Sequence, residues 1–305
     1  MAASAELQAI LDIMWQQQRA AGAAPQPINV ETIRAITDTL VRPITLPDVS
    51  VTAVSANGVP CEWLVPDGAD GTARALYLHG GGYVAGGLDS HRAFCGDLAK
   101  AAGVAVLNVD YRLAPESEGP AQLDDAMAAY KWMIENGPDG SSGAEACFIA
   151  GDSAGGGLTL ALLLAIGGAG MPKPNAAVTL SAWTDMTVSG ESLETRAATD
   201  PMVQRPLIEF CSSSVVGEDG DARDPRVSPL FGDYAGLPPL LMQVGENETL
   251  LDDTLRAADQ AKAAGVDVTL ERYPDVYHVW QTAGPSVPEA AKAIEAIGAF
   301  ILKHR

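Results

Sequence analysis

Basic residues are scarce in this chain of 305 residues, which has 19 Lys and Arg against 39 Asp and Glu and a formal net charge of −20. Such an acidic surface repels phosphate backbones and anionic lipid headgroups, so nucleic acid and membranes are poor partners. Long hydrophobic runs are also missing, because the longest, at 158–166, is too short to span a bilayer. No signal peptide is predicted, since the first basic residue is Arg19 and the early apolar residues are spaced. We therefore expect a cytoplasmic protein whose partner is a small molecule, with a homodimer left open.

Cysteine is equally rare. Cys61, Cys95, Cys147 and Cys211 have no paired spacing and form no CxxC, which predicts free thiols rather than disulfides or a zinc site. Nothing else in the sequence predicts a metal or a cofactor. The chain is 47% hydrophobic and 19% charged, a composition that supports a sizeable core and argues against disorder. Its length fits one large domain, or one domain with an added cap.

The first 45 residues predict two amphipathic helices. The first has an apolar stripe at helical spacing, with Trp15 beside it, made by Leu7, Ile10, Leu11 and Met14. Asn29 is suited to cap the second helix, which Pro43 would end. These helices are either extra cover for the core or a cap over a pocket, and we favour a cap. A second piece of cap is expected at about 183–215, within an irregular region.

From residue 73 onward, predicted strands alternate with predicted helices. Strands are expected at 49–54, 59–65, 73–78, 104–110, 147–150, 176–181, 240–244 and 268–273. Helices are expected at 90–102, 121–136, 158–165, 249–264 and 289–303. Asn57-Gly58 joins the first two strands and is a strong hairpin signal. The alternation predicts an α/β fold with a mostly parallel central sheet, helices on both faces and a ligand site at the carboxyl ends of the strands.

The run Gly151-Asp152-Ser153-Ala154-Gly155-Gly156 contains a G-x-S-x-G pattern between a predicted strand and a predicted helix. A serine on so sharp a turn needs small neighbours, which explains Gly151 and Gly155 on either side of it. The turn would lift the hydroxyl clear of the sheet, and the helix N-terminus behind it favours negative charge. The pattern alone could arise by chance, but its strand-before and helix-after context favours a nucleophilic serine.

A serine hydroxyl needs a base to take its proton, and the base needs an acid to orient it. Of the four histidines, His304 is next to the C-terminus, His91 is expected at the start of a surface helix, and His79 belongs to a glycine run. His278, in the loop after the last predicted strand, remains as the candidate base. Packing between its aromatic neighbours is the alternative role for this side chain.

The acid is expected in the loop after the preceding strand. Glu248 lies just before the predicted helix, whereas Glu246 is nearer the strand end. Asp252 and Asp253 fall within the helix and are expected to face solvent or cap neighbours. Asp275 is too close in the chain to the candidate base. We therefore favour Glu248, and the order serine, acid, histidine is the one found in α/β-hydrolases.

Acyl transfer also needs donors aimed at a developing oxyanion. The N–H of Ala154, directly after the serine, is one candidate, and the run His79-Gly80-Gly81-Gly82 supplies others. A phosphate-binding loop is the alternative for this run. It is disfavoured because no Lys-Ser or Lys-Thr follows and the spacing is not G-x-G-x-x-G.

These two runs, together with 110–116 (Asp-Tyr-Arg-Leu-Ala-Pro-Glu), resemble the hormone-sensitive-lipase family of α/β-hydrolase carboxylesterases over roughly residues 45–305. The resemblance implies that Ser153 is the nucleophile and His278 the base, and that the oxyanion donors are Gly81, Gly82 and Ala154. It also implies a helical cap before the sheet and a structural role for Asp152. One departure is that many members carry Asp-Pro-Leu where this chain has Glu248-Thr249-Leu250.

The resemblance implies a serine carboxylesterase that cleaves short- to medium-chain acyl esters without a cofactor. Residues 1–45 would form the cap and 46–305 the catalytic domain. Candidate pocket-lining residues are Met14, Trp15, Tyr83, Trp183, Met186, Met202, Leu207, Phe210 and Trp280. Lactone hydrolysis by the same triad is the enzymatic alternative. A non-enzymatic receptor is disfavoured because related receptors lack the histidine that this chain keeps at 278.

Overall fold

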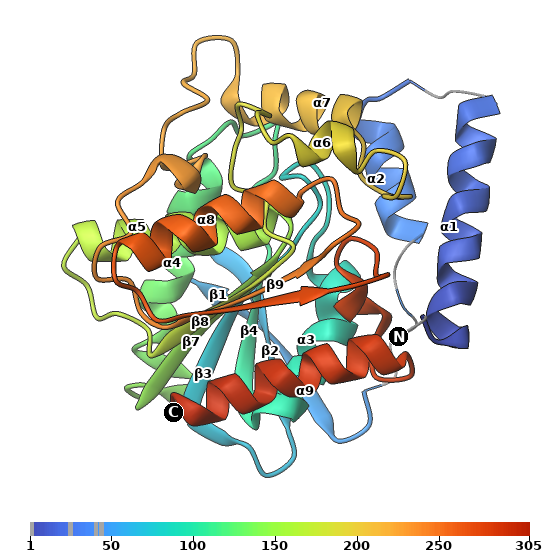
Figure 1. The fold of residues 1–305 in the computed structure, drawn as a ribbon. Helices are drawn as coiled ribbons and strands as arrows, with labels where there is room; N and C mark the ends of the chain where they lie inside the picture. Colours follow the sequence, from blue (N-terminus) through green and yellow to red (C-terminus); the bar gives the residue numbers. More distant parts are fainter. Residues whose placement is uncertain (1–2, 24–26, 40–41, 43–45) are drawn as a thin grey trace.

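A twisted eight-stranded sheet forms the centre of the computed structural model, which describes residues 3–23, 27–39, 42 and 46–305 (Figure 1). The strand order is β1-β2-β4-β3-β7-β8-β9-β10, and every neighbouring pair is parallel except the two that involve β2. The strands are β1 (Val49–Ala56), β2 (Val59–Pro66), β3 (Asp70–Leu78), β4 (Val104–Val109), β7 (Ala146–Asp152), β8 (Ala176–Leu180), β9 (Leu240–Gly245) and β10 (Val268–Tyr273). The predicted α/β fold with a mostly parallel sheet is therefore confirmed.

The hairpin that opens the sheet follows from its two turn residues. Ala56 pairs with Val59, so Asn57 and Gly58 alone make the connection. Both have positive φ, 51° and 94°, as a tight hairpin with the right-handed strand twist requires. Asn and Gly accept this conformation at low cost, which is why the local sequence was sufficient to predict the turn.

Helices cover both faces of the sheet (Figure 1). On one face lie α3 (Leu88–Ala102) and α9 (Pro288–Lys303), whose apolar residues form one core with the sheet. On the other face lie α4 (Ala121–Met133), α5 (Ala154–Gly168) and α8 (Leu251–Ala263) over a second core. The helix predicted at 121–136 ends earlier than expected, because Asn136 enters a two-stranded ribbon of β5 (Asn136–Gly137) and β6 (Gly140–Ser141). Within the described ranges, no helix has both the length and the apolar composition needed to cross a bilayer.

Four further helices gather beyond the body of the sheet: α1 (Ala5–Ala23), α2 (Val30–Thr39), α6 (Ser192–Thr195) and α7 (Arg205–Val216) (Figure 1). The side chain of Asn29 accepts a hydrogen bond from the N–H of Thr32, so the predicted cap of the second helix is confirmed. Pro43, which was expected to end that helix, and the predicted cap boundary at residue 45 lie outside the described residues. The region expected to be irregular around 183–235 contains α6, α7 and a short 3-10 turn at Pro229–Phe231.

The first helix attaches to the body through its N-terminal half. Leu7 is completely buried in a cluster with Trp280 and Tyr277. The backbone N–H and the hydroxyl of Ser4 both donate to the carboxylate of Glu289, each at 2.7 Å. This attachment places α1 against the loop that follows β10, where the candidate base lies.

Candidate active site

Ser153 stands on a strained turn between β7 and α5. Its backbone has φ 52° and ψ −119°, a conformation that an L-residue rarely adopts. The flanking glycines are required sterically: an ideal Cβ on Gly155 would lie 1.9 Å from the carbonyl oxygen of Leu78. One on Gly151 would lie 2.3 Å from the carbonyl oxygen of Gly155. The turn presents the hydroxyl of Ser153 at the carboxyl end of the strand, above the sheet.

Three side chains that are far apart in the sequence form one hydrogen-bonded chain at this edge. The Ser153 hydroxyl lies 2.8 Å from Nε2 of His278, and Nδ1 of His278 lies 2.8 Å from Oε2 of Glu248. Glu248 follows β9 and His278 follows β10, so the parallel register of the sheet brings both loops beside the turn after β7. The arrangement suits proton transfer from the hydroxyl to the imidazole while the carboxylate fixes the ring.

Burial and pairing act in opposite directions on the pKa of His278, the candidate base. Burial of His278 disfavours the imidazolium, but the hydrogen bond to Glu248 and its negative charge outweigh this, so the pKa of His278 is raised above 6.5. Burial also raises the pKa of Glu248, partly offset by its hydrogen bonds to His278 and Ser181. The carboxylate of Glu248 therefore stabilises the charged imidazole that would form when a hydroxyl proton is transferred to His278.

We expect kcat/KM to be lost as the pH falls, because only the neutral imidazole of His278 accepts a proton. Since the pKa of His278 is raised, the acid limb of the profile should lie above pH 6.5. In Glu248→Gln, burial still lowers the pKa of His278, but the carboxylate that raised it is gone. The acid limb should therefore move to lower pH. Ester hydrolysis followed by pH-stat titration measures both profiles, and a limb unmoved in Glu248→Gln would contradict the pairing.

The other candidate acids have different partners. Glu246 is half-exposed and lies 3.3 Å from the guanidinium of Arg272. Asp252 accepts the N–H of Ser192. Of the two roles expected for Asp253, facing solvent or capping neighbours, the structure shows the second: it is 1% exposed, it accepts backbone N–H groups after β8, and burial raises its pKa to about 7. Asp275 is exposed in the turn before the base.

The glycine run after β3 forms a tight loop beside the serine turn. Gly81 has φ 117° and Gly82 has φ 63°, in the region that favours glycine. A Cβ on Gly81 would lie 2.2 Å from the carbonyl oxygen of Ala85, and one on Gly82 would lie 2.7 Å from Sγ of Cys211. Gly81 therefore packs against the backbone of Ala85 within the loop, and Gly82 packs against Cys211 of α7. The third predicted donor, Ala154, is the first residue of α5, directly after Ser153.

Asp152 ties the glycine loop to the serine turn. Its carboxylate is 3% exposed and accepts hydrogen bonds from the Tyr77 hydroxyl at 2.6 Å and the Gly80 N–H at 2.9 Å. Burial opposes its ionisation, but the neighbouring His91 and the Tyr77 hydrogen bond lower its pKa below 3.8. His91 lies near the start of α3, an outer helix as expected, but its side chain is 8% exposed and its Nε2 lies 3.3 Å from Asp152. A buried carboxylate with these partners suits the structural role expected of Asp152.

Tyr111, within the run at 110–116, contacts the first residue of the same loop, His79. Its hydroxyl donates to the carbonyl oxygen of His79 at 2.6 Å, and its ring stacks on the imidazole with centroids 4.1 Å apart. The Nδ1 of His79 lies 2.7 Å from the carbonyl oxygen of Gly80, and burial lowers the pKa of His79 to about 3. His79 is therefore neutral, and its contacts with Gly80 and Tyr111 stabilise the start of the glycine loop. The sequence does not predict this role of Tyr111, because its partner His79 is 32 residues away.

Of the predicted pocket-lining residues, Trp280 lies apart from the others. Tyr83 is buried beside Trp183, with ring centroids 6.0 Å apart. Trp15 is half-buried on α1, and Met202 is 36% exposed in the loop before α7. Trp280 is fully buried elsewhere: it packs on Tyr273 and the N-terminal half of α1, and its indole N–H donates to the main chain of α9. Trp280 is therefore a core residue, and the prediction that it lines the pocket is wrong.

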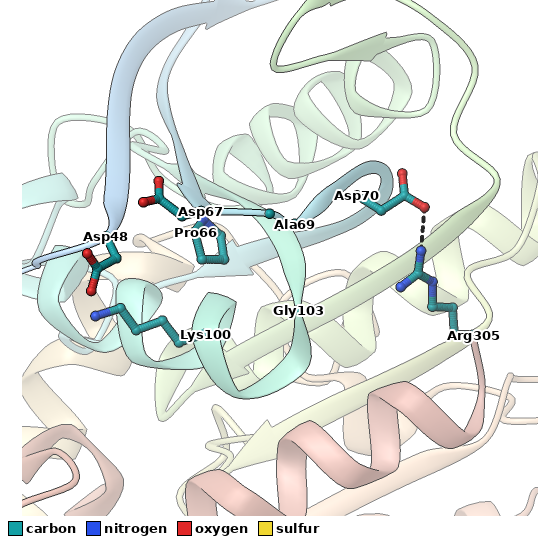
Figure 2. A pocket seen from close by; sticks show the side chains of 9 residues that line it. Asp48, Pro66, Asp67, Ala69, Asp70, Lys100, Gly103 and Arg305 are labelled. Carbon is teal, nitrogen blue, oxygen red and sulfur yellow. Dashed lines mark hydrogen bonds and ion pairs between the residues drawn. The ribbon is translucent and has the colours of Figure 1, made fainter.

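A separate hollow of about 390 Å³ lies far from the serine (Figure 2). Asp70 begins β3 and Gly103 precedes β4, so this hollow is at the amino ends of the parallel strands, opposite the serine turn. Asp70 forms an ion pair across this hollow with Arg305.

The four cysteines are free and buried. Among the described residues, no group of three or more His, Cys, Asp or Glu side chains could hold a metal ion.

Comparison with known proteins identifies relatives over most of the chain. Residues 75–282 match the model of a family described by its alpha/beta hydrolase fold. The chain is 43% identical to an acetyl-hydrolase of Streptomyces hygroscopicus over 250 residues, 81% of each chain. It is 32% identical to an ethyl acetate hydrolase of Pseudomonas putida, covering 86% of this chain and 84% of that one. A crystal structure of an esterase from the bacterial hormone-sensitive lipase family is 41% identical, with a TM-score of 0.90 over 100% of this chain and 99% of the other.

Proposed function

Since this chain belongs to the hormone-sensitive-lipase family of α/β-hydrolase esterases and is an ester hydrolase, we propose that it works as a serine carboxylesterase with Ser153 as its nucleophile. The observation that carries the proposal is the hydrogen-bonded chain from Ser153 through His278 to Glu248. It supplies a nucleophile, a base and an orienting acid in the order that acyl transfer requires.

The reaction has two steps with the same groups. The Ser153 oxygen attacks the ester carbonyl carbon while His278 takes the hydroxyl proton on Nε2. The N–H groups of Gly81, Gly82 and Ala154 stabilise the resulting oxyanion. The alcohol leaves with the proton returned by His278, and an acyl-serine ester remains. Water then attacks this ester with His278 again as base, which releases the acid and restores the free serine.

The cap is proposed to set the length of the acyl chain. It comprises residues 1–45 and 183–215 over the catalytic domain of 46–305. Two contacts support this reading: Gln18 of α1 donates to the carbonyl oxygen of Asp200 in the second segment, and α7 covers Gly82. The names of the relatives, an acetyl-hydrolase and an ethyl acetate hydrolase, favour short acyl groups. The free buried thiols and the acidic surface are compatible with a reducing cytoplasm.

We expect p-nitrophenyl esters from acetate to laurate to be hydrolysed with a maximum between about C4 and C8, the range implied by the family. Each methylene buried under the cap contributes roughly 0.8 kcal/mol, so pocket depth should appear as a chain-length preference. Trp15→Ala should shift or flatten the maximum while acetate turnover stays nearly unchanged. Ile13→Ala is the matched control, because Ile13 is on the same helix but 55% exposed.

Three results of this series would change the proposal. An intact protein that hydrolyses none of the esters would contradict the esterase assignment itself. Equal loss on every ester in Trp15→Ala would mean that Trp15 supports the fold instead of the pocket. A kcat/KM for ε-caprolactone far above that of every linear ester would make lactone hydrolysis the main activity.

A further inference from the structure

Ser181 is a buried serine held in an unusual backbone conformation beside the catalytic groups. It follows directly on β8, is completely buried and has φ 50°. Its N–H donates to the carbonyl oxygen of Gln243 in β9 at 2.8 Å, so its backbone is attached to the neighbouring strand. A non-glycine residue with positive φ persists only where its surroundings hold it, and such residues concentrate at functional sites.

The hydroxyl of Ser181 joins the acid to the segment that carries the base. It lies 2.7 Å from Oε1 of Glu248, to which it donates. It also accepts the N–H of Val279, the residue after His278, at 3.2 Å. Oε1 of Glu248 accepts a second hydrogen bond from the N–H of Gly245 at 2.6 Å. Two donors on Oε1 fix the carboxylate plane and leave Oε2 for His278.

We propose that Ser181 is a positioning residue for ester hydrolysis, which acts through Glu248 and His278 without touching the substrate. The inference rests on the proposed function, because it concerns the groups assigned there. A hydroxyl is needed in both of its roles, as a donor to the carboxylate and as an acceptor for a buried N–H. Removing it leaves Glu248 with one donor on Oε1 and leaves the N–H of Val279 without this acceptor.

The first test is Ser181→Ala, which keeps the side-chain volume nearly unchanged. A hydrogen bond to a charged group is among the stronger ones, so we expect kcat to fall by about 10- to 100-fold with KM within about threefold of wild type. The low-field proton NMR resonance of His278 Nδ1–H should shift or broaden, since the carboxylate orientation changes. Unchanged kcat with an unchanged resonance would overturn the proposal.

Thr179→Val is the matched control. Thr179 lies in β8, two residues before Ser181, and is completely buried, and its hydroxyl has no hydrogen-bond partner among the described residues. Losing this hydroxyl removes a buried polar group from β8 without touching the acid or the base. We expect kcat and the His278 resonance to stay at their wild-type values. A loss in Thr179→Val equal to that in Ser181→Ala would mean that the effect is general to the strand, and would overturn the specific role.

A double-mutant cycle separates positioning from a merely structural contribution. If Ser181 acts through Glu248, Ser181→Ala should lower kcat less than about threefold in the Glu248→Gln background. A full further loss of 10- to 100-fold would show independent action and reject the proposal. The cycle also separates two failures: near-wild-type activity in Glu248→Gln rejects the assigned triad, whereas wild-type activity in Ser181→Ala alone rejects only the positioning role.

Ser181→Gly covers the case in which the alanine variant does not fold. Glycine adopts φ 50° without strain, so the backbone of this variant should be no more strained than that of the wild type. It lacks the hydroxyl as well, and the same fall in kcat is expected. A folded Ser181→Gly with wild-type kcat and NMR resonance would overturn the proposal.

Discussion

Ser153→Ala is expected to lower kcat for p-nitrophenyl butyrate by on the order of 10⁶-fold, because no other group can form the acyl-enzyme once the hydroxyl is gone. KM should change little, since the proposed cap and the glycine loop stay in place. Steady-state rates and circular dichroism measure the activity and the fold together. The melting temperature should stay close to that of the wild type, because Ser153 has a backbone φ of 52° that alanine must adopt just as serine does.

The control for this variant is Ser55→Ala, at an exposed position of β1 far from the serine turn, which should keep full activity. A serine-directed organophosphate should label the wild type at Ser153 and leave Ser153→Ala unmodified by mass spectrometry. Retention of more than a few per cent of activity in Ser153→Ala, or labelling at another serine, would show that a different group is the nucleophile.

Glu248→Gln is expected to have the second-largest effect, a loss of roughly 10³- to 10⁴-fold in kcat. The carboxylate accepts Nδ1–H of His278 and thereby keeps Nε2 free to take the serine proton. A glutamine amide can present an N–H to Nδ1 and favour the wrong tautomer, and it lacks the charge that stabilises the imidazolium. Pre-steady-state rates with a p-nitrophenyl ester should show the loss in both acylation and deacylation, because His278 is the base in each step.

Glu246→Gln is the matched control, because it makes the same change two residues earlier in the same loop. Glu246 is half-exposed and faces Arg272, so its activity should remain within about twofold of wild type. Asp252→Asn should behave similarly, since Asp252 bonds to the main chain at Ser192. A crippled Glu246→Gln with an active Glu248→Gln would reverse the assignment of the acid.

Local sequence signals predicted the fold because each depends on a few neighbouring residues. The Asn57-Gly58 hairpin follows from the positive φ that both residues tolerate. The glycines around Ser153 follow from how closely the strand and helix approach, which any larger side chain would obstruct. The same reasoning did not predict that the side chains of His91 and Asp253 are buried, because their burial depends on chain segments far away in the sequence.

The sequence by itself determined the alternation of strands and helices, the strained serine turn and the short set of residues able to act as nucleophile, base and acid. These follow from backbone sterics, hydrophobic periodicity and the chemistry of a few residue types. The tertiary structure alone decided which carboxylate lies 2.8 Å from His278, that Trp280 belongs to the core, and that Ser181 connects Glu248 to the segment after His278. Ser181 is 67 residues from Glu248 and 98 from Val279. Contacts over such separations depend on the register between β8 and β9 and on the loops beyond them, which no local pattern specifies.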